Sequence, residues 1–334
     1  MQSTEPLLVI EDLAVEFRTD EGVVKAVDGA SFTVGRGEIV GVVGESGSGK
    51  SVTAMSILGL VKSGRRAGGT IRFRGRDLAT LPAKELRGIR GAEIAMIFQD
   101  PMTALNPVVT VGRQIVEALK LHDRKLSRSA ARDRAIELLA LVGMPDAAAR
   151  FKQYPHEFSG GMRQRAMIAM AIANGPSLLI ADEPTTALDV TIQAQVLDLL
   201  SVAQQETQAA TLLITHDLGV VAELADRVVV MYAGRVVEQG DVTTVFTEPR
   251  HPYTVGLLES LPRLDRDVDE LHPIPGSPPS LLAPPSGCPF HPRCPLARDR
   301  CRTERPQPRV VGAGHHSACH FAEELAAVHP EVTR

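Results

Sequence analysis

Residues Gly44 to Ser51, GESGSGKS, have the types and spacing of a phosphate-binding loop, G-x-x-x-x-G-K-S/T. They stand between the apolar, strand-like EIVGVV and the helix-like VTAMSILGL. Glycines would let backbone N–H groups surround phosphates at the start of the helix, Lys50 would pair with the β- and γ-phosphates, and Ser51 would bind Mg²⁺. The alternative is an ordinary glycine-rich turn. The predicted nucleotide-binding residues of this loop are Gly44, Glu45, Ser46, Gly47, Ser48, Gly49, Lys50 and Ser51.

An acidic pair ends a second apolar run, SLLIADEP, at Asp182 and Glu183. Carboxylates at the end of a buried strand cost free energy unless they have a chemical function. Asp182 fits a carboxylate that binds Mg²⁺ through coordinated water, and Glu183 fits a base that aligns and polarises attacking water. The alternative is a pair of solvated carboxylates that open the next turn. The sequence has no guanine-reading N-K-x-D, so kinases, recombination ATPases and transport ATPases stay open while a GTPase is disfavoured.

The elements that must position these residues alternate between strand-like and helix-like segments. Apolar residues at spacings of three and four predict helices in TVGRQIVEALKLH, SRSAARDRAIELLALVG and TIQAQVLDLLSVAQQE. Alternating strands and helices predict an α/β fold with a largely parallel sheet that is covered on both faces. The strand-like runs are LLVIEDLAVEF, ASFTVGRGEIVGVVG, GTIRFRG, AEIAMIFQD, SLLIADEP, ATLLITHD and RVVVMYAGRVVEQG.

Composition bounds the class of protein. With 334 residues, 44% of them apolar, the chain is long enough for one large domain with an appendage or for two domains. The formal net charge of -4 gives no electrostatic reason to expect nucleic acid as a partner. The sequence lacks an apolar run of membrane-spanning length and a signal-peptide pattern, so we expect a cytoplasmic chain, in which clustered cysteines more often hold metal than form disulfides.

The stretch FSGGMRQR, Phe158 to Arg165, resembles the signature motif of ATP-binding-cassette (ABC) ATPases. A serine and two glycines that open a helix form a second anion site, which suits the nucleotide of a facing subunit. Ser159, Gly160 and Gly161 are therefore predicted to bind nucleotide. The resemblance implies the P-loop NTPase ABC fold, with a RecA-like parallel sheet core, an N-terminal antiparallel β subdomain and a helical signature subdomain.

The resemblance assigns further roles in the order that the family requires. Gln99 in IFQDP looks like the Q-loop glutamine, which contacts Mg²⁺ or water, and TALD, Thr186 to Asp189, looks like the D-loop at the dimer interface. His216 in LLITHD looks like the switch histidine, which contacts the γ-phosphate and holds Glu183. Phe17 is the candidate for stacking on adenine, with core packing as the alternative. The implied catalytic residues are Glu183, His216 and Gln99, and the implied Mg²⁺ ligands are Ser51, Gln99 and Asp182.

Four stretches extend the resemblance to nearly the whole chain: FQDPMTALNP, FSGGMRQRAMIAMAIANGP, HPYTVGLLESLP and the tail after PSLLAPPSGCPF. Together they resemble the D-type ATPase subunit of dipeptide and oligopeptide importers, and methionine after SGG is typical of the D-type. The resemblance implies an ATP- and Mg²⁺-dependent ATPase, peripheral on the cytoplasmic face of the membrane. Its implied partners are an F-type ATPase subunit, two transmembrane permeases and an external substrate-binding protein. The alternatives are a nickel or glutathione importer and a soluble, non-transport ABC ATPase.

The amino-acid composition changes after Glu248, because 15 of the 23 prolines lie beyond it. We expect an ABC nucleotide-binding domain over residues 1–250, with a helical subdomain at about 103–175, and an extension over 251–334. Proline at this density predicts an irregular extension after one helix in HPYTVGLLESLP, not a regular helical or sheet domain.

All four cysteines lie in this extension, with the spacing C-x5-C-x6-C-x17-C. Four thiolates can hold zinc or a [4Fe–4S] cluster, and the lack of a close C-x2-4-C pair disfavours zinc. The resemblance favours the [4Fe–4S] cluster, because peptide-importer ATPases with this tail carry one, and leaves Zn²⁺ or cysteines without a ligand as the alternatives. One of the nearby histidines 291, 315, 316 and 320 could replace a cysteine ligand, although solvated loop histidines are the simpler interpretation. The predicted ligands are Cys288, Cys294, Cys301 and Cys319.

Overall fold

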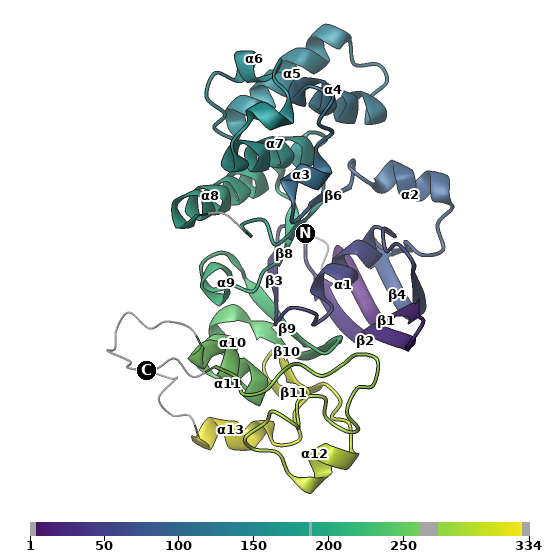
Figure 1. Ribbon diagram of the computed structural model, residues 1–334, viewed down its shortest axis with the longest axis vertical. Coiled ribbons are helices and arrows are strands. Elements are labelled where there is room, and N and C mark those ends of the chain that lie inside the picture. The colour runs from purple at the N-terminus through teal and green to yellow at the C-terminus, as the bar shows by residue number, and fades with distance from the viewer. Residues whose placement is uncertain (1–4, 187–188, 261–272, 329–334) are drawn as a thin grey trace. The chain divides into compact units, whose positions relative to one another are not determined.

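The computed structural model describes residues 5–186, 189–260 and 273–328, and the chain divides into two compact units whose elements Figure 1 labels. Both units are discontinuous in sequence. The first contains Met1–Leu7, Val34–Glu38 and Thr80–Ile214, and the second contains Leu8–Thr33, Ile39–Ala79 and Thr215–Arg334.

Three parallel strands form the sheet of the first unit: β6 (Ile94–Ile97), β7 (Leu178–Asp182) and β8 (Ala210–Ile214). Every residue of β7 and β8 is buried. The continuous apolar runs of the sequence therefore correspond to strands covered on both faces, as predicted for a parallel sheet.

Helices make up the rest of the first unit. Two of them, α4 (Val111–His122) and α5 (Arg128–Leu141), confirm the helices predicted from the spacing of apolar residues. Helix α5 begins where the Ser127 hydroxyl accepts the N–H of Ala130. Gly112 lets α4 pack closely, because a Cβ there would lie 2.1 Å from the Phe151 ring. The helices are α2 (Ala83–Ile89), α3 (Pro101–Ala104), α4 (Val111–His122), α5 (Arg128–Leu141), α6 (Ala147–Arg150), a 3-10 helix (Pro155–Glu157), α7 (Gly160–Ile172) and α8 (Val190–Thr207).

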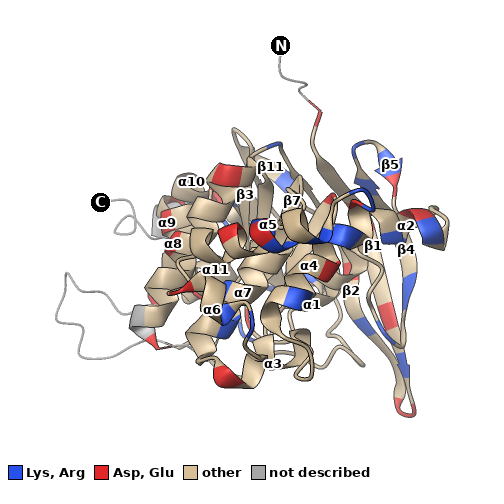
Figure 2. Ribbon diagram, turned by 90° about the horizontal axis from the view of Figure 1, so that it is seen from above, with Lys and Arg blue, Asp and Glu red and all other residues tan. Residues whose placement is uncertain are grey.

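The N-terminal part of the second unit is a sheet with the strand order β2-β1-β4-β5, which confirms the antiparallel β subdomain. Its strands are β1 (Leu8–Thr19), β2 (Gly22–Val34), β4 (Gly64–Phe73) and β5 (Arg76–Asp77). Figure 2 shows both signs of charge along these strands. One exposed ion pair on this sheet joins Arg72 and Glu11 at 2.9 Å. Such exposed pairs contribute at most about 1 kcal/mol each, so the buried apolar face carries the stability of the sheet.

A second sheet of this unit is mixed. β3 (Ile39–Val43) is parallel to β9 (Arg227–Tyr232), and β10 (Arg235–Asp241) is antiparallel to β9. The tail adds two strands, β12 (His315–Ser317) on β10 and β11 (Arg309–Gly312) on β12. The prediction of an irregular extension after one helix did not include these two short strands, which form because the open edge of β10 provides the backbone partners that β12 satisfies.

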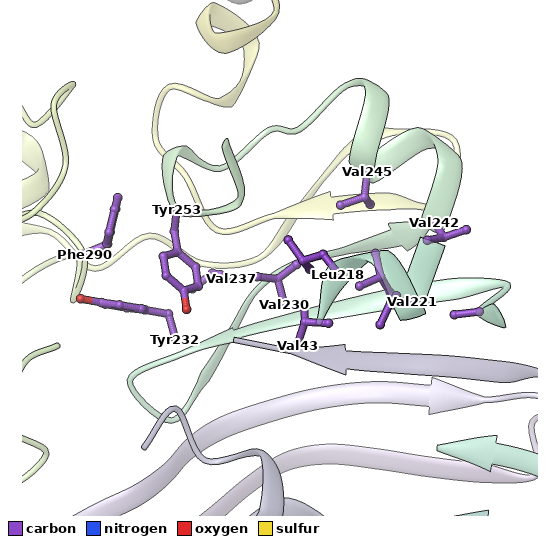
Figure 3. Close-up of a cluster of buried hydrophobic side chains, with 12 residues drawn as sticks. Val43, Leu218, Val221, Val230, Tyr232, Val237, Val242, Val245, Tyr253 and Phe290 are labelled. Atoms are coloured by element: carbon purple, nitrogen blue, oxygen red, sulfur yellow. The ribbon is translucent and has the colours of Figure 1, made fainter. Parts of the chain in front are cut away.

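Figure 3 shows the apolar core of the second unit, in which Val43, Val230 and Val237 of three strands meet the aromatic rings of Tyr232 and Tyr253. Phe290, from the tail, completes the cluster, with its ring centroid 5.2 Å from that of Tyr232 and 5.4 Å from that of Tyr253. The tail is therefore part of this core. The helices of the unit are α1 (Lys50–Ile57), α9 (Leu218–Leu224), α10 (Val242–Thr247), α11 (Pro252–Glu259), α12 (Asp299–Thr303) and α13 (Ala322–Val328).

One tail histidine departs from the expectation of solvated loop histidines. His315 is only 2% exposed, and its Nε2 lies 2.7 Å from Oε1 of the fully buried Glu238. Glu238 also accepts the N–H of His251, and burial raises the pKa of its carboxyl. Because the histidine and its partner are 77 residues apart, the sequence could not show this contact.

His251 caps α11 from a buried position and predicts a pH dependence of stability. Its Nδ1 accepts the N–H of Tyr253 at 3.1 Å, and burial lowers the pKa of the ring to about 3. The unfolded chain binds a proton below about pH 6.5 that the folded chain cannot, so the free energy of unfolding falls as the pH drops through that value. We expect His251 to account for a loss of about 1.4 kcal/mol between pH 7.5 and 5.5.

Urea unfolding at both pH values, followed by circular dichroism, checks this prediction. The control is His251→Asn, whose side-chain oxygen still accepts the N–H of Tyr253 but does not titrate. Between pH 7.5 and 5.5, the free energy of unfolding of the variant should fall by about 1.4 kcal/mol less than that of the wild type. An unchanged pH dependence in the variant would assign the effect to other groups.

Candidate nucleotide site

The predicted phosphate loop of the second unit lies between the end of β3 at Val43 and the start of α1 at Lys50. Three of its glycines have positive φ: 148° at Gly44, 77° at Gly47 and 100° at Gly49. A Cβ at Gly44 would lie 2.1 Å from the carbonyl oxygen of Met231, and one at Gly49 would lie 2.5 Å from that of Ala26. Glycine is therefore required at both positions by conformation and by space.

Two polar side chains of this loop, those of Ser48 and Lys50, are buried. Lys50 is buried, and its Nζ donates to the carbonyl oxygens of Gly44 at 2.6 Å and Glu45 at 3.0 Å. The Ser48 hydroxyl is also buried and has no hydrogen-bond partner among the described residues. A buried hydroxyl without a partner, next to an ammonium group and the N-terminus of an eight-residue helix, fits a loop that receives phosphate oxygens.

The first unit carries the predicted carboxylates. Asp182 is the last residue of β7 and is buried, and Glu183 follows it with a φ of 46°. Glu183 Oε2 accepts hydrogen bonds from Gln99 Nε2 and Thr186 Oγ1, both at 2.9 Å. Its own N–H donates to the carbonyl oxygen of Ile214, at the end of β8. Two side-chain donors thus fix one oxygen of a carboxylate whose backbone conformation is costly for a residue with a Cβ.

The signature segment opens α7. Ser159 caps this helix, with its hydroxyl accepting the N–H of Met162, and Ser159 and Gly160 are exposed. Gly161 is close to the side chain of Ile192 of α8, since a Cβ there would lie 3.0 Å from it. The exposed helix start is the geometry that a second phosphate-binding site requires.

The remaining predicted residues lie at strand ends or within a strand. His216 is exposed and lies between β8 and α9, two residues after Ile214. Phe17 is half-buried on β1, where it faces Gly64 of β4. Residues 187 and 188 of the predicted D-loop are outside the described residues, and Asp189 caps α8 by accepting the N–H of Ile192.

Two features of this site escaped the sequence reasoning. Thr186 was assigned to the D-loop only, and its bond to Glu183 follows from their separation of three residues in the turn after β7. Glu45 is held by Tyr253 and Arg293, which are 208 and 248 residues away and gave no signal in the sequence.

The four cysteines of the tail are free thiols that line one cavity of the second unit. Burial raises the pKa of the Cys294 thiol to about 11 and that of the Cys319 thiol to about 12. His291 and His320 also line the cavity, together with apolar side chains that include Leu296. Within the described part of the chain, no three His, Cys, Asp or Glu side chains are placed at once to hold a metal ion.

Comparisons with known proteins agree with this geometry. Residues 27–186 match the ABC transporter family, and residues 237–301 match the C-terminal region of oligopeptide/dipeptide transporters. The dimeric bacterial ABC transporter cassette MJ0796 is 28% identical, with a TM-score of 0.64 over 70% of this chain and 98% of that one. The glycine loop, the acidic pair and the serine-glycine helix start thus belong to an ABC-type ATPase fold.

Longer matches narrow the class. The dipeptide transport ATP-binding protein DppD of Bacillus subtilis (strain 168) is 53% identical over 324 residues, 96% of each chain. DppD of Escherichia coli (strain K12) is also 53% identical, over 94% of this chain and 96% of that one. The oligopeptide transport ATP-binding protein OppD of Mycobacterium tuberculosis (strain ATCC 25618 / H37Rv) is 54% identical over 94% of this chain but 52% of its own length. The chain belongs to the ABC transporter family, and its relatives within it are ATP-binding proteins of peptide transport.

The contact of Gly44 with β9 predicts a large effect of adding one methyl group. Gly44→Ala should lower the free energy of unfolding by about 3 kcal/mol or more, because the new Cβ would overlap the carbonyl oxygen of Met231. Gly47→Ala is the matched control in the same loop, since nothing lies within 4 Å of its Cβ position and only its φ is unfavourable. It should cost about 1 kcal/mol. Thermal and urea unfolding measure both, and equal losses would show that the overlap is relieved elsewhere.

Proposed function

We propose that this chain hydrolyses ATP to power the import of dipeptides or oligopeptides, as the ATPase subunit of an ABC transporter. The observation that carries the proposal is the 53% identity to a dipeptide transport ATP-binding protein along 96% of both chains. The match of residues 237–301 to the C-terminal region of oligopeptide/dipeptide transporters supports it independently of the ATPase motifs. A soluble, non-transport ATPase would have no use for that region.

In the proposed reaction, residues 44–51 surround the phosphates of ATP, with Lys50 as the charge partner of the β- and γ-phosphates. Ser51, Asp182 and Gln99 bind Mg²⁺ directly or through water. The buried Lys50 and the unpartnered Ser48 hydroxyl support this role for the loop. Mg²⁺ would neutralise charge that develops on the phosphates.

Glu183 is the proposed base that aligns the attacking water. Its bonds to Gln99 and Thr186 fix one carboxylate oxygen, so the orientation of the carboxylate is set, which supports the role. His216 would contact the γ-phosphate, and Phe17 would stack on the adenine. Gln99, a proposed Mg²⁺ ligand, also donates to Glu183, which supports assigning the two side chains to the same reaction.

We further propose that Ser159, Gly160 and Gly161 bind the nucleotide held by a facing ATPase subunit. The exposure of Ser159 and Gly160 at the start of α7 supports this, as does the dimeric form of the similar cassette. The facing subunit would be the F-type ATPase. The pair of ATPases would dock on two transmembrane permeases, which receive substrate from an external substrate-binding protein. No described helix is long and apolar enough to cross a membrane. As the ATPase subunit of such a transporter, the chain would lie peripherally on the cytoplasmic face. Residues 1–250 would form the nucleotide-binding domain and 251–334 the importer-specific extension.

Two substitutions separate the binding and chemical roles. Glu183→Gln should bind ATP with near-normal affinity and lose about a hundredfold or more in turnover, because the amide cannot act as a base. Lys50→Ala should instead weaken ATP binding by about tenfold or more, since it removes the charge that faces the phosphates. Both are measured on the complex that the tagged chain captures from membranes. Near-normal turnover in Glu183→Gln, or unchanged affinity in Lys50→Ala, would refute the assigned role, and capture of a single soluble chain would refute the transporter role.

We propose that the cavity lined by the four cysteines binds a [4Fe–4S] cluster, with a single Zn²⁺ as the alternative. The donor set supports the proposal: among the described residues, four thiols and three imidazoles line the cavity, and no carboxylate does. Thiolates hold either cluster or zinc, and a bound cation would reverse the effect of burial on their protonation. The group would link segments around residues 288, 301 and 319 and so act structurally.

Metal analysis of anaerobically purified protein checks this proposal. A cluster should give brown protein with broad visible absorption and about four iron and four sulfide per chain, because each iron takes one thiolate. Cys301→Ser, at the most buried of the four positions, should lose most of the iron. Colourless protein with about one zinc per chain would select the alternative, and protein without either metal would refute the site.

A further inference from the structure

Arg293 of the tail reaches the phosphate loop through a paired contact with Glu45. Its Nη1 and Nη2 donate to the two carboxylate oxygens of Glu45, at 2.6 Å and 2.9 Å. The Arg293 side chain is 5% exposed and that of Glu45 is 26% exposed, so the pair is largely shielded from water. Two-point pairing of a guanidinium with a carboxylate is stronger and more directional than a single-point ion pair.

The guanidinium is fully used by its surroundings. Its Nε donates to the carbonyl oxygen of Pro275 at 2.8 Å, and Nη2 also reaches that of Ile274 at 3.3 Å. Nη1 also reaches the hydroxyl of Tyr232 at 3.4 Å. With the two bonds to Glu45, each of the five N–H donors has an acceptor. A lysine has three donors on one atom and could not replace this set.

Glu45 is fixed by its backbone as well. Its N–H donates to the hydroxyl of Tyr253 at 2.7 Å, and its carbonyl oxygen accepts from Lys50 Nζ and from the N–H of Ser48. Tyr253 and Arg293, which lie outside the loop, therefore hold Glu45 through its N–H and its carboxylate. Lys50, which belongs to the loop, binds the carbonyl oxygen of the same residue. Loss of either outside contact would free the carbonyl group that orients Lys50.

We infer that Arg293 is a positioning residue for nucleotide binding, which acts through Glu45 to hold the phosphate loop in its receptive conformation. The cysteine-bearing segment, in which Arg293 lies between Cys288 and Cys294, thereby sets the affinity of the loop for ATP. This inference rests on the phosphate-binding role proposed above for residues 44–51. Arg293 is assigned no contact with ATP, because the groups that accept its hydrogen bonds all belong to this chain.

The test compares three variants in the assembled complex. Arg293→Met keeps the length and apolar stem of the side chain but removes the pair, and should raise the Kd and KM for ATP about tenfold, with kcat changed less than about twofold. Arg293→Lys should fall between wild type and Met, because it keeps the charge but not the fork. Arg305→Met is the control, since Arg305 also ties the tail to the body, through Asp28 at 2.9 Å, without contact to the loop. Its Kd should stay within about twofold of wild type.

A double variant supplies the readout that a merely structural role would not produce. Glu45→Gln alone should raise the Kd to a similar degree, and Glu45→Gln with Arg293→Met should be no weaker than the weaker single variant, because both act through one contact. If Arg293→Met does not fold, Glu45→Gln and Arg293→Lys carry the test. Unchanged Kd in folded Arg293→Met, additive losses in the double variant, or an equal loss in Arg305→Met would overturn the inference. Lys50→Ala separates failure of this inference from failure of the proposed phosphate-binding role. If Lys50→Ala binds ATP with normal affinity, the phosphate-binding role of residues 44–51 is itself wrong.

Discussion

The narrow space around the phosphate loop is the constraint on which the rest of the second unit depends. A loop that directs N–H groups inward must present its outer side to other parts of the chain, and here that side is packed without room for a side chain at Gly44 or Gly49. The carbonyl groups that close this space belong to Met231 of β9 and Ala26 of β2, which are about two hundred residues apart in sequence. Both sheets of the unit must therefore be in place before the loop has its shape. The apolar core to which β3, β9 and β10 contribute Val43, Val230 and Val237 holds β9 in place by apolar packing.

The carboxylate of the first unit is arranged on a different principle. Glu183 has a left-handed backbone conformation, which costs about 1 kcal/mol or more for a residue with a Cβ, and the turn after β7 retains it because the N–H of Glu183 bonds to Ile214. That conformation turns the side chain toward Gln99 and Thr186. Backbone strain at this one position accompanies a carboxylate whose orientation is fixed by two side-chain donors.

The sequence predicted the parts of this structure that depend on local pattern. Continuous apolar runs such as that of β7, helical spacing in α4 and α5, and the glycine spacing of the loop each depend on residues that are neighbours in the chain. The strands β11 and β12 had no such signal, since they have four and three residues and exist because β10 offers an edge. The burial of His315 and the pair Arg293–Glu45 join segments 77 and 248 residues apart, so only the folded chain reveals them.

The tail is held to the rest of the second unit because it buries surface there that would otherwise be exposed. Without Phe290 the rings of Tyr232 and Tyr253 would lose their edge contacts, and without β12 the edge of β10 would be open. A fully buried phenylalanine contributes about 3 to 5 kcal/mol, a large share of the stability of a domain. The same two tyrosines direct their hydroxyls at Arg293 and at the N–H of Glu45. The apolar contacts that hold the tail and the polar contacts that hold the phosphate loop thus share the same side chains, so the tail cannot loosen without the loop losing its outer support.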